Sequence, residues 1–252
     1  MAERTLAYFV SDVHLGLDVN DPAGREARFV EFLQSIPKDR TKALYMLGDI
    51  WDFWYEYRDV VPKGYVRVFA SLMDLIAGGV EVYFFQGNHD IWCYSYFEEM
   101  GIRVLRQPYV ADLGGVRICM GHGDGLGPGD TFYKIMRAAF HSRFLQVLFS
   151  MLHPWLAFRL GTGWSKKSRL AKNFEYSFRG ESEPLWQFAV DFAAKEKVDC
   201  FIFGHYHAGT DMTLPSGARF MLLSDWVRPQ SSNWILFDLT TGCFGISQKI
   251  EK

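Results

Sequence analysis

The sequence lacks any apolar run of the roughly 18 residues that a helix needs to cross a bilayer. Its N-terminus enters a strand-like segment within a few residues of Met1, which predicts that the chain carries no signal peptide. The four cysteines are scattered along the chain and form no close pair. This spacing argues against a disulfide framework or a zinc ribbon and favours reduced thiols in the cytoplasm.

Acidic residues are missing from one long segment. Between Thr131 and Phe174 there is no Asp or Glu, whereas eight of the 27 Lys and Arg residues lie there: Lys134, Arg137, Arg143, Arg159, Lys166, Lys167, Arg169 and Lys172. The rest of the chain therefore carries 19 basic and 29 acidic residues, so the net charge of −2 hides a segment of +8. The chain also shows no internal repeat and no low-complexity linker, and its apolar fraction of 49% is typical of an ordered globular protein.

Strand-like and helical patterns alternate in the first half of the chain. Apolar, β-branched and aromatic runs predict strands at 6–10, 43–47 and 82–85, separated by helical patterns at 23–36 and 65–77. This βαβαβ order predicts a sheet covered by helices, with a site at the carboxyl ends of its strands. Farther along we expect a hairpin (110–113 and 116–120), a helix (184–197), a strand (200–203) and a final meander of strands (212–214, 220–223, 234–237 and 244–247).

Polar side chains follow five of these strands. They are Asp12 and His14; Asp49; Asn88, His89 and Asp90; His122; and His205 and His207, and they include five of the seven histidines. In an extended chain, residues two apart point the same way, so the two spaced pairs are each expected to face one side. Each motif alone is compatible with a turn or a hydrogen-bonded core histidine, but five together favour a site.

The residue types at these strand ends indicate a metal centre. Imidazole, carboxylate and amide ligands together suit Mn²⁺, Fe²⁺ or Zn²⁺, of which we expect Mn²⁺ first. The ligand types argue against an all-thiolate site and against an all-oxygen site for Mg²⁺ or Ca²⁺. Side chains in this number are too many for one ion and suit two ions that share a carboxylate. Two ions roughly 3.5–4 Å apart can hold a phosphate that undergoes in-line attack, which predicts hydrolysis of a phosphoester or phosphoanhydride.

The motifs resemble those of the calcineurin-like metallophosphoesterases, in full and in order. The matching stretches are Asp12-x-His14, Gly48-Asp49-x-x-Asp52, Gly87-Asn88-His89-Asp90, Gly121-His122 and Gly204-His205-x-His207. The resemblance implies a mixed α/β or α+β fold, a four-layer αββα sandwich in one domain spanning 1–252. It also implies one metal held by Asp12, His14 and His207, a second held by Asn88, His122 and His205, and Asp49 bridging them. His89 would be the acid or the transition-state stabiliser, oriented by Asp90.

A finer resemblance, over nearly the whole chain, is to the UDP-2,3-diacylglucosamine diphosphatases of lipid A biosynthesis, in the form found in Bacteroidetes. The matching stretches are 47–54, 60–64, 121–130, 164–169 and 224–226. The resemblance implies cleavage to lipid X and UMP on the cytoplasmic face of the inner membrane, with Ser165, Lys166, Lys167 and Arg169 facing the diphosphate. The proteobacterial enzymes of this activity carry Arg at the position of His89.

The basic segment breaks the strand–helix rhythm, and at about 130–178 we predict a helical lid insertion. Its apolar positions indicate a helical pair or a bent helix, with Pro154 beginning a new piece. We interpret it as a lid for an amphiphilic nucleotide-lipid substrate, with cations that also meet an anionic membrane surface. A cap with merely solvated cations and a nucleic-acid patch are the alternatives, and the acidic remainder of the chain argues against nucleic acid.

Two alternative functions remain open from the sequence. One is a phosphoesterase on the same scaffold that acts on a nucleotide, a phosphoprotein or a nucleic acid. The other is a binding protein without catalysis, although such a protein would be expected to have lost metal ligands and this chain has all seven. Two smaller features also have more than one interpretation. We expect Trp51, Phe53 and Trp54 to lie in the core or in a wall of the site rather than to stack on uridine. The stretch Gly123–Gly129 could bind phosphate through its backbone N–H groups or serve as a hinge into the insertion.

Overall fold

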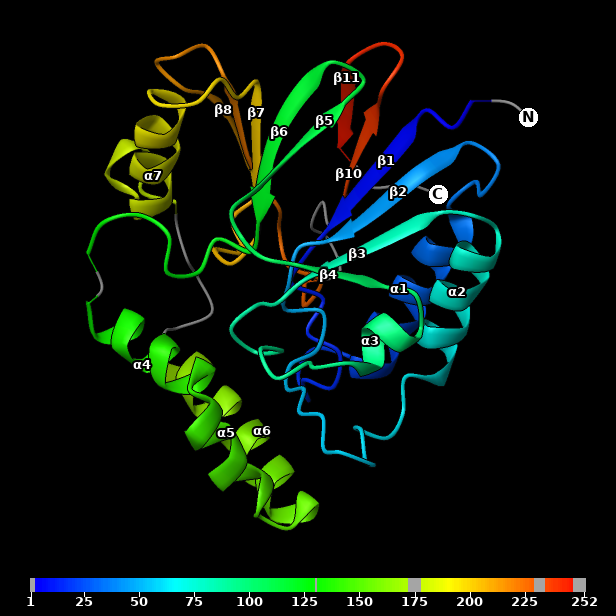
Figure 1. Cartoon of the computed structure of the whole chain (residues 1–252), viewed down its shortest axis with the longest axis vertical. Coiled ribbons are helices and arrows are strands. Elements are labelled where there is room, and N and C mark those ends of the chain that lie inside the picture. The colour runs from blue at the N-terminus through cyan, green and yellow to red at the C-terminus, as the bar shows by residue number, and fades with distance from the viewer. Residues whose placement is uncertain (1–2, 130, 172–177, 229–233, 247–252) are drawn as a thin grey trace.

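The computed structural model describes residues 3–129, 131–171, 178–228 and 234–246, and the strands within them form two sheets (Figure 1). The first sheet has the order β11-β10-β1-β2-β3-β4. Its strands are β1 (Leu6–Val10), β2 (Thr41–Met46), β3 (Glu81–Phe85), β4 (Arg103–Leu105), β10 (Trp234–Asp238) and β11 (Cys243–Ile246). β1 to β4 are parallel, and every residue of β1 is buried because helices cover one face and the second sheet covers the other.

The second sheet has the order β5-β6-β7-β9-β8. Its strands are β5 (Tyr109–Leu113), β6 (Val116–Gly121), β7 (Cys200–Phe203), β8 (Thr210–Thr213) and β9 (Arg219–Leu222). β6, β7 and β9 are parallel, whereas β5 and β8 pair antiparallel at the two edges. The carboxyl ends of β6 and β7 therefore lie at one edge of this sheet.

Three hydrophobic clusters separate four layers. The first lies between the first sheet and the helices α1 (Pro22–Ser35), α2 (Val66–Ala77) and α3 (Tyr96–Glu99). The second lies between the sheets and includes Phe9 and Ile202. The third lies between the second sheet and α7 (Pro184–Ala193), where the Trp186 ring lies 5.3 Å from that of Phe220. The αββα sandwich expected from the family resemblance is thus confirmed.

The expected meander at the end of the chain is wrong. β8 and β9 belong to the second sheet, whereas β10 and β11 extend the first sheet beside β1. Apolar alternation reports that a strand is half-buried but not which sheet it joins, so the sequence pattern could not separate the two pairs. The short β4 and α3 were missed, and α7 ends at Ala193 rather than at Lys197.

The basic segment forms three helices that project beside the sandwich at the lower left of Figure 1. They are α4 (Thr131–His141), α5 (Arg143–Ser150) and α6 (Pro154–Ala171), and α6 begins at the expected proline. Below, "insertion helices" means these three. A one-turn 3-10 helix, η1 (Gly180–Ser182), precedes α7. Gly123, Gly125, Gly127 and Gly129, on the path from β6 to α4, all have positive φ, which makes this stretch an irregular connection; its roles as phosphate cradle or hinge stay predictions.

Candidate metal centre

The polar residues that follow β1, β2, β3, β6 and β7 meet at one edge of the sandwich. Parallel strands end at the same edge of each sheet, and the two sheets face each other, so loops distant in sequence converge there. The seven candidate ligands come from all five loops, and they form two groups joined by Asp49.

The first group consists of Asp12, His14 and His207. The Nε2 atoms of His14 and His207 lie 3.3 Å apart. The Asp12 Oδ1 atom lies 3.2 Å from Nε2 of His207 and 3.7 Å from Nε2 of His14. The three ligand atoms therefore face a common point.

The second group consists of Asn88, His122 and His205. The His122 Nε2 atom lies 3.2 Å from Oδ1 of Asn88 and 3.3 Å from Nδ1 of His205. The Nδ1 atom of His122 donates to the carbonyl oxygen of Leu47 at 2.9 Å, which leaves Nε2 as the nitrogen with a lone pair for a cation.

Asp49 lies between the two groups. Its Oδ2 atom is 3.8 Å from Nε2 of His14 and 3.5 Å from Nε2 of His122. Its Oδ1 atom accepts a hydrogen bond from the backbone N–H of His89 at 2.9 Å, which fixes the carboxylate plane. One carboxylate oxygen thus faces a member of each group.

Two observations indicate that each of these groups could bind a divalent cation. Ligand atoms that bind one ion at about 2.1 Å lie roughly 3.0–3.4 Å from one another, close to the spacings within each group. The Asp12 Oδ1 atom is buried and accepts no hydrogen bond in the described part of the chain, an arrangement that is costly unless a cation neutralises it. The His and Asp clusters therefore indicate a divalent metal centre.

The backbone that carries these residues is strained. Asp12, His14, Asp49, His205 and His207 all have φ between 50° and 71°, a region that non-glycine residues enter at a cost of about 1 kcal/mol or more each. The expectation that the spaced pairs lie in extended chain is therefore wrong. His205 and His207 also point to different groups, because His205 faces His122 and His207 faces Asp12.

Two motif glycines leave space for the carboxylates. A Cβ atom at Gly87 would lie 2.1 Å from Oδ1 of Asp49, and one at Gly204 would lie 2.3 Å from Oδ2 of Asp12. Such separations are far inside van der Waals contact. The glycine in these motifs is required by the close approach of a ligand carboxylate.

The buried charges shift one another's pKa values. Burial raises the pKa of Asp49 to about 8 despite the opposing effect of His122. Burial acts to lower the pKa of His122, but Asp49 and Asp12 raise it to about 8, and Asp12 in the same way raises that of His207 to about 9. Burial opposes ionisation of Asp12, yet His207 and His14 hold its pKa well below the usual range. A cation at these groups would displace protons.

The neighbours of His89 differ from the expectation. The Asp90 carboxylate accepts hydrogen bonds from four backbone N–H groups, those of Gly87, Asp49, Ile50 and Trp51. The His89 ring instead places Nδ1 3.0 Å from the carbonyl oxygen of Asp52 and 3.7 Å from its Oδ1. The His89 ring therefore contacts Asp52, whereas the Asp90 carboxylate joins the loops after β2 and β3; the catalytic roles expected for His89 and Asp90 stay predictions.

One insertion residue reaches this site. The Ser165 side chain is buried, and its hydroxyl donates to Oδ2 of Asp52 at 2.8 Å and lies 3.2 Å from Nδ1 of His89. Lys166, Lys167 and Arg169 also lie on α6, but their side chains are outside the described part of the structure. α4 is linked to the site as well, because Arg137 and Tyr133 both donate to Oδ2 of Asp124, two residues after His122.

Sequence reasoning missed two supporting residues. Asp225 places Oδ2 3.5 Å from Nδ1 of His207, on the ring edge opposite the nitrogen that faces Asp12. Arg25 is fully buried, and its guanidinium donates to the backbone carbonyl oxygens of His14, Leu17 and Val19. Arg25 lies on the apolar face of α1, and an arginine among apolar positions was the signal that could have found it.

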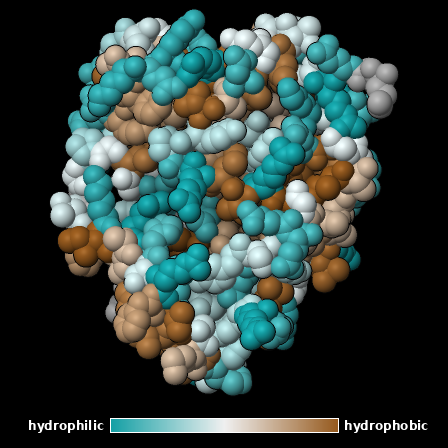
Figure 2. Space-filling model, in the orientation of Figure 1, coloured by the Kyte–Doolittle hydropathy of each residue, from teal (hydrophilic) through white to brown (hydrophobic). Residues whose placement is uncertain are grey.

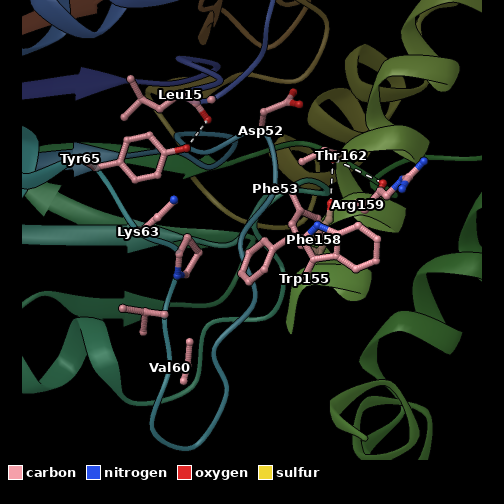
Figure 3. A pocket seen from close by; sticks show the side chains of 13 residues that line it. Leu15, Asp52, Phe53, Val60, Lys63, Tyr65, Trp155, Phe158, Arg159 and Thr162 are labelled. Carbon is pink, nitrogen blue, oxygen red and sulfur yellow. Dashed lines mark hydrogen bonds between the residues drawn. The ribbon is translucent and has the colours of Figure 1, made fainter. Parts of the chain in front are cut away.

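A groove of about 660 Å³ opens beside the metal centre, between α6 and residues 60–65. Figure 3 shows Phe53, Trp155 and Phe158 on one side and Val60, Lys63 and Tyr65 on the other, with Asp52 at one end. Trp51 and Trp54 are fully buried in the core, as expected, and Phe53 forms part of the groove wall.

Comparison with known proteins gives a family match, curated relatives and similar solved structures. The family described as Calcineurin-like phosphoesterase matches residues 7–209. A UDP-2,3-diacylglucosamine hydrolase of Porphyromonas gingivalis is 34% identical over 94% of this chain and 96% of its own length. A protein of the same name from Hamiltonella defensa is 35% identical over 79% of this chain and 76% of its own. Among solved structures, a dimetal phosphatase from Danio rerio covers 93% of this chain and 92% of its own, with 14% identity and a TM-score of 0.49.

Proposed function

Because the chain belongs to the calcineurin-like phosphoesterase family, and is therefore a metal-dependent hydrolase, we propose that it cleaves the diphosphate of UDP-2,3-diacylglucosamine. The products would be lipid X, which is 2,3-diacylglucosamine 1-phosphate, and UMP. The proposal that two metal ions take part is supported by the position of Asp49 between two ligand groups. The substrate rests on the relatives of that name, which match nearly the full chain.

Each ligand group would hold one divalent ion, with Asp49 shared between them. Two such ions supply positive charge for the phosphoryl oxygens and lower the pKa of water for in-line attack. Asp12, His14 and His207 would hold the first ion, and Asn88, His122 and His205 the second. We propose Mn²⁺ as the ion, with Fe²⁺ or Zn²⁺ as the alternatives that the mixed ligand set also suits.

His89 would act on the substrate without binding a metal. Its Nδ1 lies within hydrogen-bonding distance of the Asp52 carbonyl oxygen, an acceptor, so the ring turns Nε2 toward the centre, 4.0 Å from Oδ2 of Asp49. When the ring carries protons on both nitrogens, Nε2 can donate a hydrogen bond or a proton from there to a phosphoryl or leaving oxygen. The Asp52 side chain would hold the ring in this orientation.

The insertion helices would close over the substrate as a lid. Ser165 already contacts Asp52 and His89, and we propose that it and the neighbouring Lys166, Lys167 and Arg169 bind the diphosphate. The groove between α6 and residues 60–65 provides apolar wall next to this position.

We also propose that the protein works peripherally at an anionic membrane, on the cytoplasmic face of the inner membrane, with no nucleic-acid partner. None of the helices in the described ranges is long and apolar enough to span a bilayer. The acidic remainder of the chain would repel a nucleic acid, whereas the segment from Thr131 to Phe174 carries only positive charge.

Release of UMP from UDP-2,3-diacylglucosamine by the purified, Mn²⁺-loaded protein tests the proposal. Asp49→Asn serves as the inactive control. Metal analysis of the same samples should give two transition ions per chain in the unaltered protein. Turnover of nucleotides, phosphoproteins or nucleic acids without UMP release from the lipid would show that the substrate is wrong and the two-metal site right.

A further inference from the structure

The insertion helices have two apolar sides, of which one packs on the sandwich. The rings of Phe140 and Phe149 lie 5.4 and 5.3 Å from that of Trp92, and the Phe158 ring lies 5.5 Å from that of Phe53. Despite these contacts, neither α4 nor α5 contains a single buried residue. Their apolar content therefore exceeds what the contact with the sandwich uses.

The other side of these helices exposes large apolar side chains. Ten of the sixteen exposed large hydrophobic residues of the described chain lie between Phe132 and Leu160. On α5 and just after it, Phe144 is 69% exposed, Val147 60% and Met151 76%. Their spacing of three and four residues places them on one face, and Figure 2 shows hydrophobic surface at the lower left, where α4 and α5 lie. A cluster of this kind marks a contact surface rather than scattered apolar residues.

The charge around this face selects its partner. Arg143 directly precedes Phe144 and is exposed, and Arg159 on α6 is exposed as well, with its guanidinium 5.4 Å from the ring centroid of Trp155. No acidic residue occurs from Thr131 to Phe174. A second copy of the chain would bring two sets of like charges together, whereas an anionic lipid surface neutralises them while its acyl chains receive the apolar side chains.

We propose that the face formed by Phe144, Val147 and Met151, hereafter the α5 face, docks on an anionic lipid bilayer together with Trp155, which follows Met151 by four residues at the start of α6. This inference deepens the proposed function by naming the surface that meets the membrane. Trp155 is 63% exposed and also lines the groove that ends at Asp52. An amphiphile held in the bilayer could therefore extend its polar head toward the metal centre while its chains stay out of water.

Vesicle flotation tests the docking surface. The protein is mixed with vesicles of phosphatidylethanolamine and phosphatidylglycerol, or of phosphatidylcholine alone, at low and high salt. We expect binding to the anionic vesicles that weakens with salt. The combined variant Phe144→Ser, Val147→Ser and Met151→Ser should bind at least about tenfold less, because it removes the apolar side chains that would enter the acyl region of the bilayer.

A matched control removes the same kind of surface elsewhere. Val66→Ser, Met73→Ser and Ile246→Ser alter residues that are 75%, 43% and 39% exposed, away from the insertion helices. This variant should float like the unaltered protein. Both variants should hydrolyse the soluble diester bis(4-nitrophenyl) phosphate at the unaltered rate, which shows that they are folded.

Three outcomes would overturn the inference: equal flotation of the two variants, equal binding of the unaltered protein to phosphatidylcholine alone, or a dimer that the α5-face variant converts to monomer. The last would identify a second copy as the occupant. Flotation that depends on the α5 face without UMP release would instead leave this inference standing and contradict the proposed substrate.

Discussion

The guanidinium of Arg25 donates a hydrogen bond to the carbonyl oxygen of His14 at 2.6 Å, in the interior of the protein. His14 has a positive φ, so its peptide group needs support to stay in place. The same guanidinium holds the next turn through Leu17 and Val19. A helix residue eleven positions away thus stabilises the strained backbone of a candidate ligand.

Arg25→Met should lower the free energy of unfolding by about 2–4 kcal/mol, because it leaves buried carbonyl oxygens without a donor. It should also weaken binding of one ion. Denaturant unfolding and calorimetric Mn²⁺ titration measure the two effects. Arg28→Met, on the same helix but partly exposed, is the control and should change stability by less than about 1 kcal/mol. Equal effects of the two substitutions would contradict the role given to Arg25.

His89→Ala should keep both ions and lose most of the rate, roughly 100-fold or more in kcat, because it removes a proton or hydrogen-bond donor. Asn88→Ala should instead lower the affinity for the second ion, since the Oδ1 atom of Asn88 faces His122. Metal content and kcat measured on both variants separate these roles. If His89→Ala empties the site, the division of labour is wrong.

We expect Asp52→Asn to lower the rate of catalysis and Asp90→Asn to lower stability. Asp52→Asn alters the contacts of this side chain with His89, His14 and Ser165 but removes no candidate ligand atom, so we expect kcat to fall about tenfold with two ions still bound. Asp90→Asn disrupts a carboxylate that accepts four backbone hydrogen bonds, and we expect a stability loss of about 2–4 kcal/mol together with loss of metal. Thermal unfolding and metal analysis decide between them. The reverse pattern would restore Asp90 as the residue that orients His89.

Gly204→Ala should abolish binding of the first ion, because the added methyl would lie 2.0 Å from Oγ of Ser11 and 2.3 Å from Oδ2 of Asp12. Gly209→Ala is the matched control on the same connection, where the nearest atom would be 3.6 Å away. Metal content and the melting temperature are the measurements. Retention of two ions in Gly204→Ala would show that the loop can shift without cost.

Metal affinity should rise with pH between about 6 and 9. Asp49 and His122 have pKa values raised to about 8, and that of His207 is raised to about 9, so these groups hold protons below those values. A cation must displace those protons, and its affinity falls as the pH falls. Calorimetric titration in buffers of different ionisation enthalpy would count the protons released. A pH-independent affinity without proton release would contradict this account.

The sequence by itself determined the strand–helix order of the first half and the residues that meet at the strand ends. Both are local properties, since apolar periodicity reports burial and the ligand types report the chemistry of the ion. Asp12, Asp49 and His122 could be chosen because each follows an apolar run after a single intervening residue. The break at Pro154 and the separate basic helices were predictable for the same reason.

Only the tertiary structure decided which side chains touch. His89 precedes Asp90 in the chain but contacts Asp52 and Ser165, which lie 37 and 76 positions away. Those contacts depend on how the loops after β2 and β3 pack and on where α6 lies, and neither is encoded in a local pattern. Tertiary packing also decided that β8 and β9 join one sheet and β10 and β11 the other, and that the α5 face is exposed. An apolar helical stripe looks identical in sequence whether it is buried or left facing solvent, and only packing distinguishes the two.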